Sequence, residues 1–143
     1  MKRILMVALT VFLAGSPLTA RKKQADRNLD PRIKQVHTIY VQGNSAAAQR
    51  IKELLSERTC FELSRNSKQS DAVMAVDEND RAGRGSFGAS TNQTTVSAVI
   101  NNQAGDELWS YSTRGDSNPF RSSASNAIVR LLDDLKRDAC EAK

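Results

Sequence analysis

Residues 81–90 contain a spacing associated with phosphate binding. Gly83, Gly85 and Gly88 form the pattern G-x-G-x-x-G, which nucleotide-binding proteins use to bring backbone amides close to a phosphate. In a dinucleotide-binding unit these glycines lie between a strand and the helix whose N-terminus receives the pyrophosphate. Here the following residues, 90–100, alternate in polarity and are rich in β-branched side chains. The sequence therefore predicts no nucleotide site and no cofactor, but a long connection between two strands of a hairpin.

Long connections between strands are frequent sites of partner binding, because a rigid scaffold positions them at the surface. Arg81, Arg84 and Phe87 supply two positive charges and one aromatic ring in this connection. We predict that these three side chains contact a protein partner. An exposed strand edge that accepts a strand from the partner would add to this contact.

Acid–base chemistry would depend on His37, the only histidine. An imidazole can act as a general base, and Glu78 or Asp80 would be its acidic partner in a small hydrolase. The sequence places no nucleophile or acid beside His37, which lies in an alternating segment typical of a strand. One histidine and two distant cysteines cannot supply the usual ligands of a zinc site. We therefore expect a non-catalytic protein without a metal, with the hydrolase as an alternative.

Trp109, the only tryptophan, and Tyr111 alternate on one face of a predicted strand. Such a pair can form a platform for a sugar ring. Large aromatic side chains more often pack in the core, here beneath a helix. A ligand- or glycan-binding protein is therefore a second alternative.

The first twenty residues have the layout of a secretory signal peptide. Lys2 and Arg3 precede an apolar run, and small residues up to Ala20 form a cleavage site. The apolar run reaches roughly half of the length that crosses a bilayer. Residues 1–20 therefore predict export to the periplasm or the medium, and no transmembrane protein after cleavage.

The charge balance of the exported part excludes a strongly basic binding protein. The chain has 21 Lys and Arg against 16 Asp and Glu; Lys2 and Arg3 would leave with the signal peptide, so 19 basic residues remain. The densest basic cluster, residues 21–23, contains no aromatic residues. Nucleic-acid binders usually combine a basic patch with aromatic side chains. We expect no nucleic-acid partner.

Cys60 and Cys140 are the only cysteines, and both lie in the predicted exported part. In an oxidising compartment two cysteines usually form a structural disulfide, and their wide spacing excludes a C-x-x-C redox motif. A disulfide that closes so long a loop would stabilise the fold by roughly 4 to 5 kcal/mol. Two free buried thiols are the alternative.

The rest of the pattern predicts a flexible basic linker over residues 21–32 and a single domain over residues 33–143. Apolar periodicity predicts helices over residues 45–58 and from Asn118–Pro119 onward. Strands are expected over residues 33–42, 60–64, 71–78, 94–102 and 107–114, with Arg114, Gly115 and Asp116 in a turn before the second helix. The predicted order is β-α-β-β-β-β-α. Its class is α+β: a mixed sheet of about five strands with two helices packed on one face.

This order of elements, together with the segments VHTIYV, ELLSER, SDAVMAV, VSAVINNQAGDELWSYSTRG and SSASNAIVRLLDDL, resembles a group of small bacterial envelope domains. The group includes the N-terminal domain of the Tol-system translocation protein, the curli secretion channel family and outer-membrane activators of peptidoglycan synthases. The resemblance extends over residues 33–140. It implies a non-catalytic, periplasm-facing binding or assembly module whose partner is another envelope protein. The chain lacks the lipid-attachment cysteine common in that group, since Ser16 stands at that position.

Overall fold

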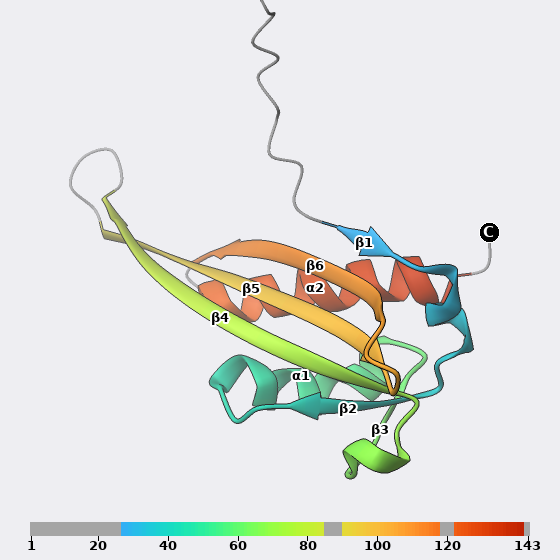
Figure 1. Cartoon of the computed structure of the whole chain (residues 1–143). Helices are drawn as coiled ribbons and strands as arrows, with labels where there is room; N and C mark the ends of the chain where they lie inside the picture. The colour runs from blue at the N-terminus through green and yellow to red at the C-terminus, as the bar shows by residue number, and fades with distance from the viewer. Residues whose placement is uncertain (1–26, 85–89, 118–121, 142–143) are drawn as a thin grey trace, which may run out of the picture.

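The computed structural model describes residues 27–84, 90–117 and 122–141. They form a mixed six-stranded sheet in the order β1-β6-β5-β4-β2-β3, with both helices on one face (Figure 1). The elements are β1 (Asn28–Leu29), η1 (Pro31–Gln35), β2 (Thr38–Gln42), α1 (Ala46–Arg58), β3 (Glu62–Leu63), η2 (Ser67–Gln69), β4 (Ala72–Arg84), β5 (Ser90–Asn102), β6 (Glu107–Asp116) and α2 (Ser123–Ala139). The predicted α+β class is confirmed, and β1 raises the strand number to six.

The middle of the sheet is an antiparallel meander of three long strands. β4 and β5 pair over 13 residues each, from Ala72↔Asn102 to Arg84↔Ser90. β5 continues into β6 through a tight turn in which Gly105 has φ +91°, a left-handed conformation that favours glycine. β2 joins β4 in parallel over four residue pairs, and α1 leads from β2 to the edge strand β3. The sheet is therefore mixed.

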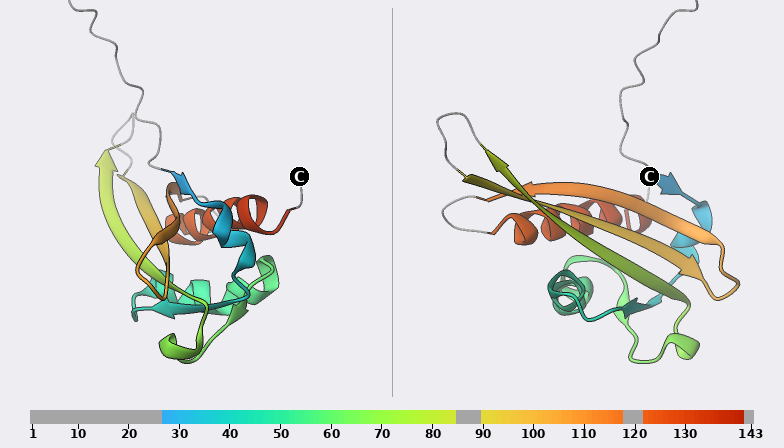
Figure 2. Two further views of the ribbon diagram at one scale, coloured as in Figure 1. Left: turned by 45° about the vertical axis from the view of Figure 1, so that its right-hand side comes forward. Right: turned by 60° about the vertical axis from the view of Figure 1, so that its left-hand side comes forward.

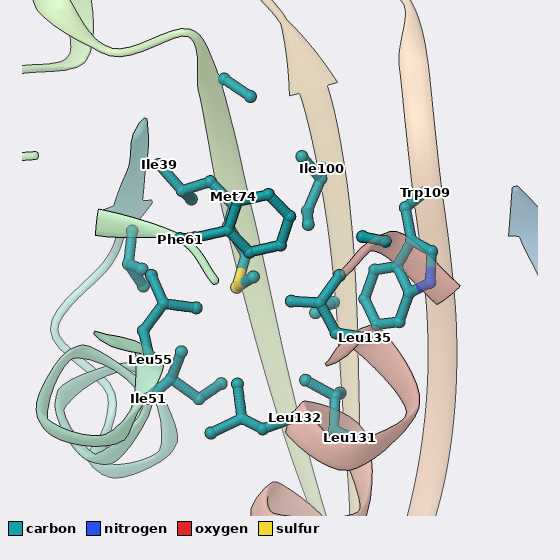
Figure 3. Packing of buried hydrophobic residues seen from close by; sticks show 14 of the residues in the cluster. Ile39, Ile51, Leu55, Phe61, Met74, Ile100, Trp109, Leu131, Leu132 and Leu135 are labelled. Carbon is teal, nitrogen blue, oxygen red and sulfur yellow. The ribbon is translucent and has the colours of Figure 1, made fainter. Parts of the chain in front are cut away.

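The core lies between the sheet and the two helices. α1 begins at the N-cap Ser45, whose hydroxyl accepts a hydrogen bond from the Ala48 amide, and buries Ile51 and Leu55. α2 buries a second apolar stripe that ends at Leu135. Figure 3 shows side chains from both helices meeting the sheet around Met74. Burial of each large side chain contributes roughly 1.5 to 3 kcal/mol, so this interface holds the layers together.

The ordered part of the domain begins earlier than the sequence predicts. Residues 33–37 are not a strand, because Pro31 starts a 3-10 turn whose N-cap Asp30 accepts a hydrogen bond from the Arg32 amide. Within the predicted linker, β1 pairs with β6 through Leu29↔Trp109. The segment from Arg27 to Arg32 is therefore part of the domain.

Other boundaries also differ from prediction: β4 continues to Arg84 instead of ending at residue 78, and β5 begins at Ser90 instead of residue 94. α2 begins after the N-cap Ser122, whose hydroxyl accepts a hydrogen bond from the Ser125 amide; the predicted start, Asn118–Pro119, lies outside the described residues. The predicted strand over residues 60–64 is reduced to the two residues of β3. Leu63 is 37% exposed because β3 is at the edge of the sheet.

The contact between β6 and α2 depends on Gly115. This glycine belongs to β6 rather than to a turn, and it is buried against the first turns of α2. A Cβ at this position would lie 2.6 Å from the Ala127 amide nitrogen and closer still to the Ser123 carbonyl oxygen. A glycine is therefore required for the close approach of helix and strand.

Candidate protein-binding edge

β4 has a long segment with a neighbouring strand on one side only. β2 pairs with residues 72–75 of β4, whereas β5 pairs with its whole length. In the described part of the chain, no strand pairs with the other side of residues 76–84, which we call the free edge. Figures 1 and 2 show the end of β4 extending with β5 beyond the two helices.

Hydrogen bonding at the start of β4 shows which backbone groups point toward the free edge. The Asp71 amide donates to the Thr38 carbonyl at 3.1 Å, so odd-numbered residues of this strand direct their N–H and C=O groups toward β2. Because backbone direction alternates along a strand, Asp77, Asn79 and Arg81 direct theirs outward where β2 has ended. The free edge therefore presents a row of donors and acceptors.

The corresponding side of β6 is covered. β1 pairs with its first half, and side chains of α2 reach the backbone of its second half. The Arg130 guanidinium donates to the Arg114 carbonyl at 3.1 Å, and the Asn126 side-chain amide donates to the Asp116 carbonyl at 2.8 Å. The two strands at the ends of the sheet, β1 and β3, have two residues each. The free edge of β4 is thus a longer template for pairing than either end strand.

Charged residues line the free edge, and some of them have structural roles. The Glu78 carboxylate accepts a hydrogen bond from the Ala47 amide at 3.1 Å, where the positive end of the α1 dipole favours an anion. Asp80 accepts one from the Thr94 hydroxyl at 2.6 Å. Asp77 and Arg81 are exposed and lie on the sheet face opposite the helices. These two side chains are therefore available to a partner.

Of the three predicted partner-binding residues, the structure places Arg81 on the free edge. The backbone of Arg84 ends β4, but its side chain lies outside the described residues, as does Phe87. Gly83 is within β4 and Gly85 and Gly88 are not described; the next element is the strand β5, not a helix. The context that phosphate binding requires after these glycines is therefore missing.

The predicted hydrolytic pair does not come together. His37 is exposed and precedes β2; its amide and that of Thr38 donate to the Asp71 carboxylate at 2.9 and 2.8 Å. These hydrogen bonds hold the pKa of Asp71 below its usual value, the bond from Thr38 contributing most. Glu78 lies seven residues after Asp71, about 23 Å from it along a strand. The pairing of His37 with Glu78 or Asp80 is therefore wrong.

Trp109 and Tyr111 belong to a packed cluster rather than to an open platform. The Trp109 side chain is 0% exposed and its indole N–H donates to the Asp138 carboxylate at 3.0 Å. Asp138 also pairs with Arg27, whose guanidinium carbon lies 5.9 Å from the centroid of the Tyr111 ring. Burial raises the pKa of Tyr111, and Asp134 raises it further. Trp109 therefore has no exposed ring face on which a sugar could stack.

A disulfide joins Cys60, which follows α1, to Cys140 at the end of α2, with a Cα–Cα distance of 5.7 Å.

Among the residues that the structure describes, no three His, Cys, Asp or Glu side chains are grouped as metal ligands would be. Neither helix of the described part combines the length and the apolar character needed to span a membrane.

Solved structures share this fold. PelC from Paraburkholderia phytofirmans, a variant with one substitution solved as a dodecamer, is 14% identical with a TM-score of 0.56, over 80% of this chain and 96% of its own. Lipoprotein B from Nitrosomonas europaea is 10% identical with a TM-score of 0.50, over 71% of this chain and 83% of its own. No protein-family model and no curated protein matches. These likenesses show the shared fold, and neither of the two structures is named as a Tol, curli or peptidoglycan-synthase activator domain.

Proposed function

We propose that the protein is an exported, non-catalytic binding or assembly module that acts through protein contacts in the bacterial cell envelope. The free edge of β4 carries this proposal. Residues 76–84 present unpaired backbone groups where β2 has ended, and such an edge binds an added strand unless something covers it. A segment of a protein partner would pair with this edge, and Arg81 would contact it.

The comparisons support an assembly role in the envelope. PelC, which has the same fold, was solved as a dodecamer, so a domain of this shape can serve in a protein assembly. The neighbour from Nitrosomonas europaea is named as a lipoprotein. The predicted signal peptide over residues 1–20 would export this chain to the envelope.

A non-catalytic role agrees with the position of the only histidine. His37 is exposed at the far end of β4 from Glu78 and Asp80, and the Asp71 carboxylate, which accepts from its amide, is engaged by two backbone amides. Replacement of His37 by Ala should therefore leave the protein's function in the cell unchanged. Loss of that function in a folded His37→Ala protein would favour the hydrolase.

Site-specific photocrosslinking in the native envelope tests the proposal. A photoreactive amino acid is placed at Arg81 on the free edge and, as a matched control, at Gln49, which is exposed on α1. We expect discrete protein adducts from position 81 and background labelling from position 49. Equal labelling at both positions, or none at position 81, would contradict a binding role for this edge.

A further inference from the structure

We infer that the segment that pairs with the free edge of β4 is a basic strand of another protein, with Lys or Arg side chains directed toward Glu78 and Asp80. The inference rests on the proposed function and names the chemistry of the partner. It is supported by the unpaired backbone of residues 76–84, by the carboxylates on that edge, and by the way in which these carboxylates disfavour a second copy of this chain.

Three carboxylates follow one another closely on the free edge. Asp77, Glu78 and Asp80 span about 10 Å along β4, at ~3.3 Å per residue. Among the described side chains, no cation lies within ion-pair distance of any of them. Residues 77–81 have three negative charges against the one positive charge of Arg81, a net charge of −2. This part of the edge therefore attracts a basic segment.

Glu78 and Asp80 lie on the sheet face that carries the helices, the face to which buried Met74 also belongs. One oxygen of Glu78 accepts a hydrogen bond from the Ala47 amide at 3.1 Å, and one oxygen of Asp80 accepts one from the Thr94 hydroxyl at 2.6 Å. These bonds position the two carboxylates without neutralising them. The second oxygen of each accepts no hydrogen bond from the described residues, so it can accept one from a Lys or Arg side chain of the partner.

The added strand would continue the line of β2. β2 leaves β4 after Ala75, and Asp77, Asn79 and Arg81 direct backbone groups outward beyond that point. A residue directly opposite in a neighbouring strand has its Cβ about 5 Å away, and a diagonal neighbour lies about 7 Å away. One long basic side chain on the helix-bearing face therefore reaches both carboxylates of that face.

The same carboxylates disfavour pairing between two copies of this edge. Antiparallel alignment on Asn79 sets Glu78 opposite Asp80 of the second copy twice, and like charges across a strand pair are unfavourable. This alignment would also bring residues 83–84 of the second copy into the place that β2 holds beside residues 74–75. The charges on the edge therefore select a different chain, one of opposite sign.

A nuclear magnetic resonance titration of the isotope-labelled exported protein tests the charge of the added strand. Two capped peptides of the same length as residues 76–84 alternate Thr with Lys or Thr with Glu, so they differ in the sign of their charge. We expect the Lys peptide to shift the amide signals of Asp77, Asn79 and Arg81 more than that of Gln49 on α1. A Glu peptide that binds equally well, or a Lys peptide that shifts none of the three signals, would overturn the inference.

Two double variants test whether Glu78 and Asp80 are the carboxylates that matter. Glu78→Gln/Asp80→Asn removes both charges but keeps an acceptor oxygen at each position, and we expect the affinity for the Lys peptide to fall about tenfold. Glu57→Gln/Glu62→Gln is the matched control, because it removes two exposed carboxylates from α1 and β3. It should change the affinity less than about twofold. Equal losses in the two variants would show only a general attraction between charges, and the inference would be wrong.

Asn79→Pro tests whether the peptide pairs as a strand. It removes an outward N–H but no hydrogen bond to β5, and proline is tolerated on an edge strand. All charges of the edge remain, yet we expect the Lys peptide to lose its binding, whereas Asn79→Ala should retain it. Circular dichroism and urea unfolding confirm that each variant is folded. Undiminished binding by a folded Asn79→Pro protein would refute strand pairing.

Crosslinking from position 81 in the envelope separates the inference from the proposed function. We expect the crosslinked partner segment, mapped by mass spectrometry, to contain Lys or Arg at alternate positions, and its yield to fall in Glu78→Gln/Asp80→Asn. If the yield does not fall, the binding role stands and the basic strand is wrong. An adduct that contains only this chain would make the partner a second copy and overturn the inference. If position 81 gives no adduct while the Lys peptide still binds, the charge selectivity stands and the proposed function fails.

Discussion

Replacement of Gly115 by Ala tests the close contact between β6 and α2. The added Cβ would lie 2.6 Å from the Ala127 amide nitrogen, whereas ordinary contact begins at 3.4 Å, so α2 would have to move away by about 1 Å or more. The clashing atoms are helix backbone, which cannot rotate away as a side chain can. The same movement lengthens the 2.7 Å contact between the hydroxyls of Thr94 and Ser123.

The expected loss of stability can be estimated from these two effects. Overpacking of a well-packed contact costs typically 1 to 3 kcal/mol, and a weakened buried hydrogen bond costs about 1 kcal/mol. We expect Gly115→Ala to lower the free energy of unfolding by about 3 kcal/mol. In urea this corresponds to a decrease of about 2 M in the midpoint, if m is about 1.5 kcal/mol/M.

A second glycine separates steric overlap from backbone strain. Gly105 has φ +91° and no atom within 4 Å of an added Cβ, so Gly105→Ala should cost only the strain, about 1 kcal/mol. Urea unfolding of both variants, followed by circular dichroism, gives the comparison. If Gly115→Ala loses less stability than Gly105→Ala, the close approach of α2 to β6 is not the reason for a glycine at position 115.

Two further predictions concern the disulfide and the decrease in the free energy of unfolding at acid pH. Reduction of the Cys60–Cys140 bond, which closes a loop with a sequence separation of 80, should lower the free energy of unfolding by roughly 4 kcal/mol; a urea midpoint that does not change with reductant would contradict this. The amides of Thr38 and His37 lower the pKa of Asp71 in the folded state. Its contribution to the free energy of unfolding is therefore fully present above the unfolded pKa of about 3.9, and it is lost as the pH falls through the lower folded pKa. Asp71→Asn should therefore flatten the decline of the urea midpoint below about pH 4, and equal acid slopes in the two proteins would refute this assignment.

The sequence predicts the layers well because the apolar spacing of each long element reports its buried face. Ile51 and Leu55 recur at helical spacing, and Met74 lies in a nearly continuous apolar run, so α1 and the start of β4 are recognisable. The residues at which helices and strands begin and end are harder to predict. Residues 33–37 contain β-branched side chains, yet Pro31 and the N-cap Asp30 set a 3-10 turn there. The local signal for a turn outweighs strand propensity.

The candidate edge can be predicted only in part. Arg81 is recognisable as a polar residue after a buried strand, but residues 77–81 are all polar, so no alternation indicates that β4 continues to Arg84. That this segment is unpaired depends on β2 ending at Gln42, and on α2 side chains covering β6 instead. Both are properties of the tertiary arrangement, so no local pattern contains them.

The pairing of Arg27 with Asp138 has a consequence for when the domain can fold. The two residues are separated by 111 positions, and the disulfide closes near the same end of α2. A chain that crosses a membrane N-terminus first would deliver Arg27 early and Asp138 almost last. Until then the apolar face of the sheet has no α2 to cover it, and long-range contacts of this kind form slowly. The export that we propose for this chain would therefore depend on a factor that shields the unfinished chain until its last helix emerges.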